Sequence, residues 1–162
     1  MAYMVAIMLG VSRKEMEGFD SAMPWIWISM SAPDEGKAKE LVSSTLIGQL
    51  NLKFHDVDDR FRDTIERYPS SKLGKSLVFF NSEMSDKVVS FVKNIIDNEP
   101  SLDLIVCQCE AGISRSSGMA ASLSKCINGV DNHFFNSDRY RPNMLVYRKV
   151  MDSWYKDKEG VI

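Results

Sequence analysis

The thirteen residues VCQCEAGISRSSG, from Val106 to Gly118, are the most informative stretch of this 162-residue sequence. The apolar run LIVCQC, which ends at Cys109, predicts a buried strand, and the residues from Arg115 or Ser116 onward predict a helix. A short loop of mostly small residues joins the two. Because the loop N–H groups and the positive end of the helix converge on one point, we expect a binding site for a tetrahedral anion there.

Three residues give this loop its expected chemistry. Gly112 has no side chain, which allows the backbone to curl around an anion. Arg115 has a planar guanidinium that can bind two anion oxygens at once, which a lysine cannot do. Cys109 lies at the bottom of the loop, where the positive groups favour its thiolate, a nucleophile in line with the phosphorus of a bound phosphate. The expected phosphate-binding backbone comprises Glu110, Ala111, Gly112, Ile113, Ser114 and Arg115.

The segment CEAGISRS resembles the signature loop C-x-x-G-x-x-R-[ST] of the cysteine-dependent protein phosphatases, especially the compact dual-specificity type and small tyrosine-phosphatase-like proteins of bacteria and phages. The resemblance implies hydrolysis of phosphate monoesters on proteins, at phosphotyrosine and, as a further candidate, at phosphoserine or phosphothreonine. It implies that Cys109 forms a phosphocysteine, that Arg115 binds phosphate and that the Ser116 hydroxyl stabilises the departing thiolate. Neither a metal nor a cofactor is implied. Gln108 departs from the family, which usually has histidine there, although glutamine can still bind neighbouring backbone.

A carboxylic acid is expected to face the loop, because the leaving oxygen of a phosphate ester needs a proton. The stretch LNLKFHDVDDRF offers several aspartates at the end of a predicted strand. In the dual-specificity pattern the acid lies just after this strand, and Asp56 fits that position, with Asp58 in reserve. The alternative is an acidic turn that caps a helix. His55 either orients the neighbouring acid or is an ordinary surface histidine.

The rest of the sequence predicts an α/β fold: a mostly parallel central sheet of four to five strands with helices on both faces, in one domain spanning 1–162. Ser85 is the expected N-cap of a helix over 86–97. Trp25 and Trp27 share one strand face and are expected in the core. The other expected helices cover 116–127 and 144–155, and the expected strands are Tyr3–Leu9, Trp25–Met30, Leu50–His55 and Leu104–Gln108.

Composition narrows the function classes. The formal net charge of -2 argues against a nucleic-acid-binding protein. Three cysteines and two histidines match neither a disulfide framework nor zinc-ligand spacing, so a reducing cytoplasm is the expected compartment. The N-terminal apolar run is too short to span a membrane and predicts a strand. The segment PSSKLGKS lacks the first glycine of a nucleotide-binding loop and predicts a turn. We expect a monomer that acts on a phosphorylated protein or peptide.

Two other functions stay open at this stage. Gln108 suggests a phosphate-binding module that docks phosphoproteins without turnover. Cys107 suggests thiol redox chemistry of the arsenate-reductase kind, but a bridge to Cys109 across one residue would be strained, and a packed core thiol is the simpler interpretation. The element Arg141-Pro142-Asn143 resembles one that supports the active-site loop in the family, and the alternative is the start of the last helix.

Overall fold

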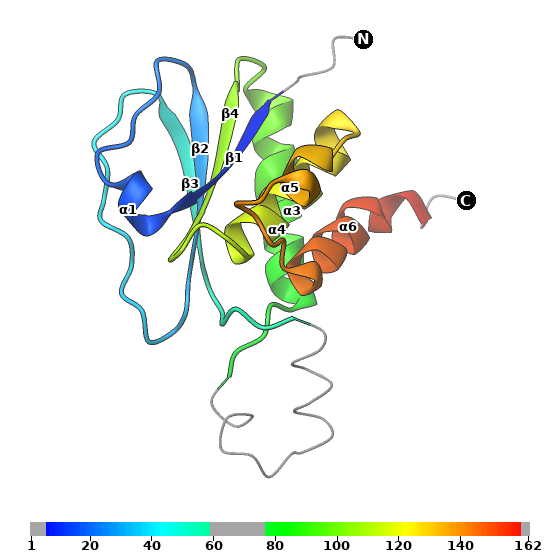
Figure 1. Cartoon of the computed structure of the whole chain (residues 1–162). Helices are drawn as coiled ribbons and strands as arrows, with labels where there is room; N and C mark the ends of the chain where they lie inside the picture. The colour runs from blue at the N-terminus through cyan, green and yellow to red at the C-terminus, as the bar shows by residue number, and fades with distance from the viewer. Residues whose placement is uncertain (1–5, 59–76, 160–162) are drawn as a thin grey trace.

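A computed structural model describes residues 6–58 and 77–159. These residues form a four-stranded sheet of β1 (Ile7–Ser12), β2 (Trp25–Ser31), β3 (Leu46–Lys53) and β4 (Leu104–Cys109). The strand order is β1-β4-β2-β3, and every adjacent pair is parallel, as Figure 1 shows. All four strands therefore end at the same edge of the sheet, and β4, which carries the predicted nucleophile, lies between β1 and β2. The predicted parallel α/β architecture is confirmed.

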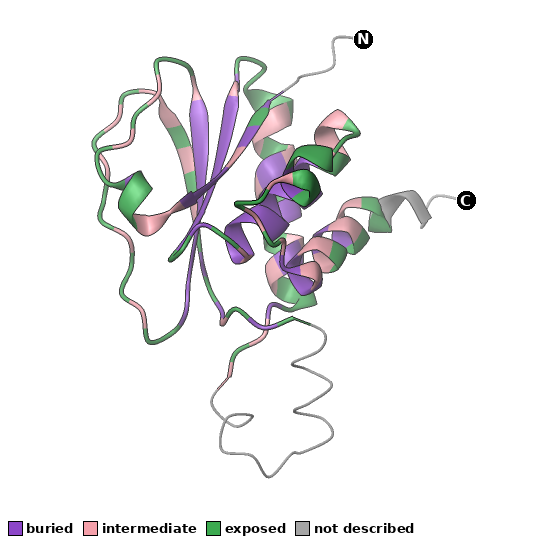
Figure 2. Ribbon diagram, in the orientation of Figure 1, coloured by how far each residue is buried: buried purple, intermediate pink, exposed green. Residues whose placement is uncertain are grey.

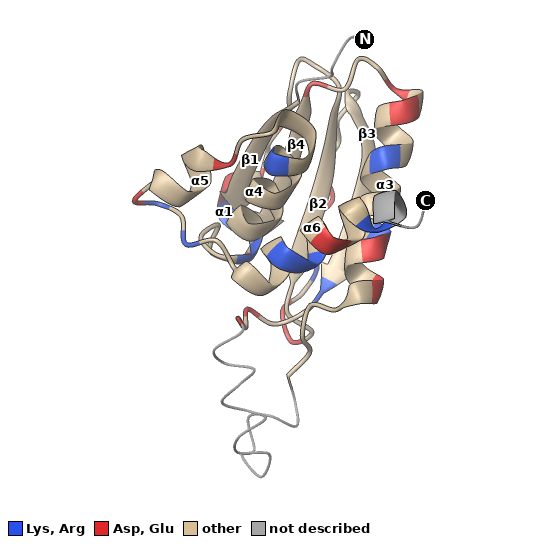
Figure 3. Cartoon of the chain, turned by 90° about the vertical axis from the view of Figure 1, so that its right-hand side faces the viewer, with Lys and Arg blue, Asp and Glu red and all other residues tan. Residues whose placement is uncertain are grey.

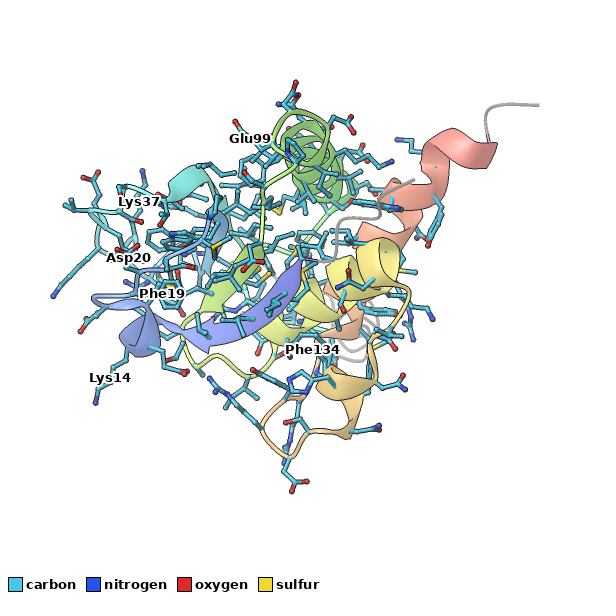
Figure 4. The ribbon with its side chains drawn as sticks, turned by 90° about the horizontal axis from the view of Figure 1, so that it is seen from above. Lys14, Phe19, Asp20, Lys37, Glu99 and Phe134 are labelled. Atoms are coloured by element: carbon cyan, nitrogen blue, oxygen red, sulfur yellow. The ribbon has the colours of Figure 1, made fainter. Side chains whose placement is uncertain are left out.

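Helices lie on both faces of the sheet, but unequally (Figure 1). One face is covered by α3 (Ser82–Asn98), α4 (Arg115–Asn128), α5 (Asn132–Asn136) and α6 (Met144–Glu159). The other face is covered by α1 (Arg13–Met16) and the segment that connects β2 to β3. In Figure 4 the labelled Phe19 and Phe134 lie on opposite sides of the sheet.

Two apolar clusters fill the layers, because the side chains of each buried strand alternate between the faces. Ile26 and Ile28 of β2 join the cluster under the large helices. Trp25 and Trp27 point to the opposite face, pack with Val106 and are fully buried, as predicted. Figure 2 shows both central strands buried along their length. The sheet is thus a rigid support for the loop that follows β4.

Helix α3 begins earlier than the sequence predicts. Its N-cap is Asn81, whose side chain accepts a hydrogen bond from Met84 N–H at 2.9 Å. Ser85 is therefore not the cap, and that prediction is wrong. Ser85 is buried inside the helix, where its hydroxyl lies 2.6 Å from that of Ser153 in α6. Lys156 and Asp86 add an ion pair between the same helices, at 3.4 Å, in the region of mixed charge shown in Figure 3.

The strand boundaries also shift. Strand β3 runs over Leu46–Lys53, not over the predicted Leu50–His55, because it is an edge strand whose exposed positions interrupt the apolar pattern. Strand β1 runs over Ile7–Ser12, beyond the predicted end at Leu9. Residues 77–80 form neither strand nor helix, and the rejected nucleotide-binding segment at 69–76 lies outside the described residues. No helix in the described ranges is long and apolar enough to cross a membrane.

Candidate active site

The loop between β4 and α4 curls around the sulfur of Cys109. Gly112 has a φ of 71°, and its N–H donates to Cys109 Sγ at 3.3 Å. The Cys109 thiol in turn donates to the Ser116 hydroxyl oxygen at 3.2 Å. A hydroxyl can rotate, so the Ser116 O–H can donate to the sulfur when Cys109 is a thiolate. The predicted nucleophile, the loop backbone and Ser116 are therefore in contact.

Gly112 is required by its surroundings as well as by its backbone angles. A Cβ at this position would lie 2.5 Å from Ser12 N and 2.7 Å from Val11 C. Both atoms belong to the backbone of β1, which cannot move aside as the end of a flexible side chain would. The close approach of the loop to β1 is possible only because residue 112 has no side chain.

Arg115 is the first residue of α4, and its side chain is only 7% exposed. Its Nη1 donates to Phe54 O at 3.1 Å, and its Nη2 lies 3.5 Å from Glu35 Oε1. The other oxygen of Glu35, Oε2, accepts from Ala32 N–H at 2.9 Å, so the β2–β3 connection is tied to the arginine. These contacts hold the guanidinium and leave most of its five donors for an anion.

The predicted acid, Asp56, is joined to the loop by its side chain. Its Oδ1 accepts from the Ser114 hydroxyl at 2.7 Å and from Asn143 Nδ2 at 2.9 Å. Because both donors reach one oxygen, Oδ2 remains to carry a proton. Asp58, the reserve choice, lines the same surface hollow of about 670 Å³ as Asp56, Ile113 and Ser114.

Asn143 connects three parts of the site. It donates through Nδ2 to Val57 O at 3.0 Å in addition to Asp56, and its backbone N–H donates to Ser114 O at 3.0 Å. Its Oδ1 accepts from Val146 N–H at 3.1 Å, in the first turn of α6. Both interpretations of the Arg-Pro-Asn element therefore apply, since the element supports the loop and also begins the last helix.

The comparisons with known proteins support the fold through a solved structure. No family model matches the sequence, and no curated protein matches it. Among solved structures, human DUSP28 superposes with a TM-score of 0.50 at 8% identity and covers 94% of each chain. The chain has a dual-specificity-phosphatase-like fold.

Two further structures are similar over most of the chain. One is the human tyrosine phosphatase-like serine/threonine/tyrosine-interacting protein, with a TM-score of 0.48, 14% identity, and coverage of 86% of this chain and 78% of that one. The other is a mouse putative dual specificity phosphatase complexed with zinc tungstate, with a TM-score of 0.45, 9% identity, and coverage of 83% and 73%.

Of the two cysteines outside the loop, Cys107 is a core residue and Cys126 is only partly buried. Cys107 is fully buried, and burial, followed by the neighbouring Cys109, raises the pKa of its thiol far above the usual range. Burial raises the pKa of Cys126 to about 12, against a smaller lowering by Lys93. All three cysteines are free thiols. Neither Cys107 nor Cys126 therefore forms a thiolate readily near neutral pH.

Glu35 is the site residue that the sequence analysis did not identify, and Asn143 was identified only as part of an element that supports the loop. The Asn143 motif was visible, but not its bond to Asp56. Glu35 lies in a connection without periodicity, and no local pattern marks it. His55 accepts from Val78 N–H at 2.9 Å through Nδ1, and its Nε2 lies 3.5 Å from Asp34 Oδ1, so these contacts anchor the end of β3. The described residues contain no group of three or more potential metal ligands.

Proposed function

We propose that this chain hydrolyses phosphate monoesters on proteins through a phosphocysteine intermediate. The observation that carries the proposal is the joint position of Cys109, Arg115 and Asp56 around one loop at the end of β4. The Cys109 sulfur accepts a hydrogen bond from Gly112 N–H, and Arg115 is the first residue of the following helix. The Asp56 carboxylate accepts a hydrogen bond from the Ser114 hydroxyl of the loop. The phosphatase-like fold supports the same reaction class.

In the first step, the Cys109 thiolate attacks phosphorus and forms an S–P bond. The bond between phosphorus and the ester oxygen breaks, and protonated Asp56 gives its proton to that oxygen, so the alcohol or phenol leaves neutral. The loop N–H groups and Arg115 stabilise the charge on the equatorial oxygens of the transition state.

In the second step, a water molecule attacks phosphorus. Asp56, now a carboxylate, accepts a proton from this water. The S–P bond breaks, the electron pair returns to Cys109, and the Ser116 hydroxyl donates to the resulting thiolate. Inorganic phosphate leaves, and the thiolate and the protonated acid are regenerated.

The proposed substrate is a phosphorylated protein or peptide in the cytoplasm, with phosphotyrosine as the first candidate. The loop side chains Glu110 and Ile113 offer no extra positive charge for a highly phosphorylated inositol, and Glu110 is itself paired with Arg13 at 2.6 Å. The proposed reaction uses neither a metal nor a cofactor. A monomer contains every proposed catalytic group.

The test is hydrolysis of a phosphotyrosine peptide by the purified protein, its Cys109→Ser variant and a Cys126→Ser control. We expect turnover by the wild type and the control, loss of turnover in Cys109→Ser, and vanadate binding by all three. Binding without turnover in the wild type would instead support the phosphate-binding module. A mixed disulfide formed under arsenate would support redox chemistry. Cys107 is a poor partner for such a disulfide, because it is fully buried.

A further inference from the structure

Gln108 directly precedes the proposed nucleophile and is fully buried in the sheet. Its Oε1 accepts from the Ser29 hydroxyl at 2.7 Å and from Trp27 Nε1–H at 3.3 Å. Its Nε2 donates to Cys109 O at 3.1 Å. Ser29 is also the register partner of Gln108 across the parallel strands β2 and β4. One buried amide thus links β2 to the backbone of the nucleophile.

The orientation of this amide is fixed by its neighbours. An indole N–H can only donate, so the atom that faces Trp27 must be the carbonyl oxygen of Gln108. The main-chain carbonyl of Cys109 can only accept, so the atom that faces it must be the amide nitrogen. A flipped amide would break both contacts and leave buried polar groups unsatisfied, which is costly.

The bonded carbonyl belongs to the peptide between Cys109 and Glu110, where the strand becomes the loop. A peptide unit is planar, so fixing its C=O also fixes the direction of the Glu110 N–H, the first donor of the proposed phosphate-binding backbone. The next carbonyl, Glu110 O, accepts from Arg13 N–H at 3.1 Å. Two successive peptide groups at the start of the loop are therefore held from outside it.

We propose that Gln108 is a positioning residue that orients the Cys109–Glu110 peptide, and with it the nucleophile and the first loop donor, independently of pH. This inference rests on the proposed function and deepens it. An amide does not titrate, so it satisfies Trp27, Ser29 and Cys109 O at every pH. A histidine at this position would accept only when neutral, because a protonated imidazole has no acceptor.

The side chains that contact Gln108 from the neighbouring strands have no titratable group. Trp27 and Ser29 on β2 and Val11, its register partner on β1, carry no charge. Beyond them, Arg13 after β1 pairs with Glu110 in the loop, and Glu35 of the β2–β3 connection pairs with Arg115 of α4. Two thiols flank Gln108 in the chain, Cys107 and Cys109. Burial raises the pKa of Cys107, which keeps it protonated near neutral pH, and both cysteines are common to all variants compared below.

The first experiment compares Gln108→Met and Ser29→Ala with the wild type and with Ser122→Ala. Methionine keeps the length of the side chain but removes both hydrogen-bonding ends. Ser122 is a matched control, because it is a buried α4 serine whose hydroxyl binds Met119 O at 2.8 Å. Each protein is assayed for kcat and KM on an aryl phosphate, for tungstate affinity and for the rate of Cys109 alkylation by iodoacetamide.

We expect Gln108→Met to lower kcat and the alkylation rate by about 10- to 100-fold, the usual cost of a misplaced catalytic group. Ser29→Ala should lower both in the same direction but less, since the Trp27 and Cys109 contacts remain. Tungstate affinity should fall in parallel, because the Glu110 N–H loses its fixed direction. Ser122→Ala should lower the melting temperature without changing kcat or alkylation.

The second experiment uses Gln108→His and measures activity relative to the wild type between about pH 5 and 8. The ratio of variant to wild type should fall as the pH drops through about 6.5, where an ordinary imidazole gains its proton. Dividing by the wild-type activity removes the pH dependence that the two proteins share. A purely structural loss would lower this ratio equally at every pH.

The proposal is overturned if the activity of Gln108→His relative to the wild type does not change with pH. It is also overturned if Gln108→Met and Ser29→Ala have the wild-type kcat and the wild-type rate of Cys109 alkylation. If Gln108→Met does not fold, Ser29→Ala and Gln108→His still decide the question. If the wild type has no phosphatase activity, the proposed function fails, yet alkylation and tungstate binding still test whether Gln108 positions Cys109. The two failures are therefore distinguishable.

Discussion

Replacing Asp56 by asparagine removes the proposed acid while preserving the local geometry. The Oδ1 atom of Asp56 accepts two hydrogen bonds, from Ser114 at 2.7 Å and from Asn143 at 2.9 Å. An asparagine carbonyl oxygen can accept both, so the loop and the start of α6 keep their connection. The second carboxylate oxygen becomes an NH₂ group, which cannot deliver a proton to a leaving oxygen.

We expect Asp56→Asn to lower kcat by about 10²–10⁴-fold on substrates with poor leaving groups, the usual contribution of general acid catalysis. This corresponds to roughly 3–5 kcal/mol of transition-state stabilisation. The loss should be much smaller on activated aryl phosphates, whose leaving oxygen needs little protonation. The decline in rate at higher pH that follows from loss of the acid's proton should also disappear.

The assay measures kcat for a phosphotyrosine peptide and for a series of aryl phosphates of increasing leaving-group acidity. Asp58→Asn is the matched control, since Asp58 lines the same hollow. A steep leaving-group dependence in Asp58→Asn but not in Asp56→Asn would move the acid to residue 58. An equal loss on every substrate in Asp56→Asn would mean that Asp56 only supports the loop, and the proposed role would be refuted.

Two further predictions concern the packing of the loop and of the core. Gly112→Ala should destabilise the fold by at least about 1–2 kcal/mol, the cost of a left-handed backbone with a Cβ. It should also abolish most turnover, because that Cβ would lie 2.5 Å from the β1 backbone. Thermal unfolding and kcat measure the two effects, and a normal kcat would contradict the prediction. Burial raises the pKa of Cys107, so its thiol stays protonated near neutral pH, and Cys107→Ala should lose about 1 kcal/mol of stability while keeping turnover. Peptide mapping after iodoacetate treatment should find Cys109 labelled and Cys107 protected, whereas a disulfide between them would support the redox alternative.

The elements that could be predicted from the sequence are those that depend on residues adjacent in the chain. The apolar run up to Cys109, the glycine at 112 and the small residues that begin α4 are adjacent in the chain, so their spacing alone predicts a strand, a loop and a helix. The face shared by Trp25 and Trp27 follows from the two-residue period of a strand. Asp56 was selected by its position after a strand, and its bond to Ser114 agrees with that choice without testing the role.

The features that could not be predicted depend on contacts between distant segments. Asn81 and Ser85 are both good N-cap residues by type. In the structure Asn81 caps the helix, and Ser85 lies inside it, where it packs against Ser153 of α6. The start of β3 was missed because an edge strand needs no continuous apolar run. Glu35 has no sequence signal, because its role depends on Arg115, eighty positions further along the chain.

The sheet topology explains why these distant residues meet. Parallel strands end at one edge, and open α/β sheets bind ligands beyond the carboxyl ends of their strands. Here β4 delivers Cys109 to that edge, β3 is followed by Asp56, and β2 is followed by Glu35. Strand β1 ends beside the loop at Ser12, where Gly112 makes their close approach possible. A phosphate bound by this loop would therefore contact groups whose positions are set by the sheet, which is the preorganisation that electrostatic stabilisation of a transition state requires.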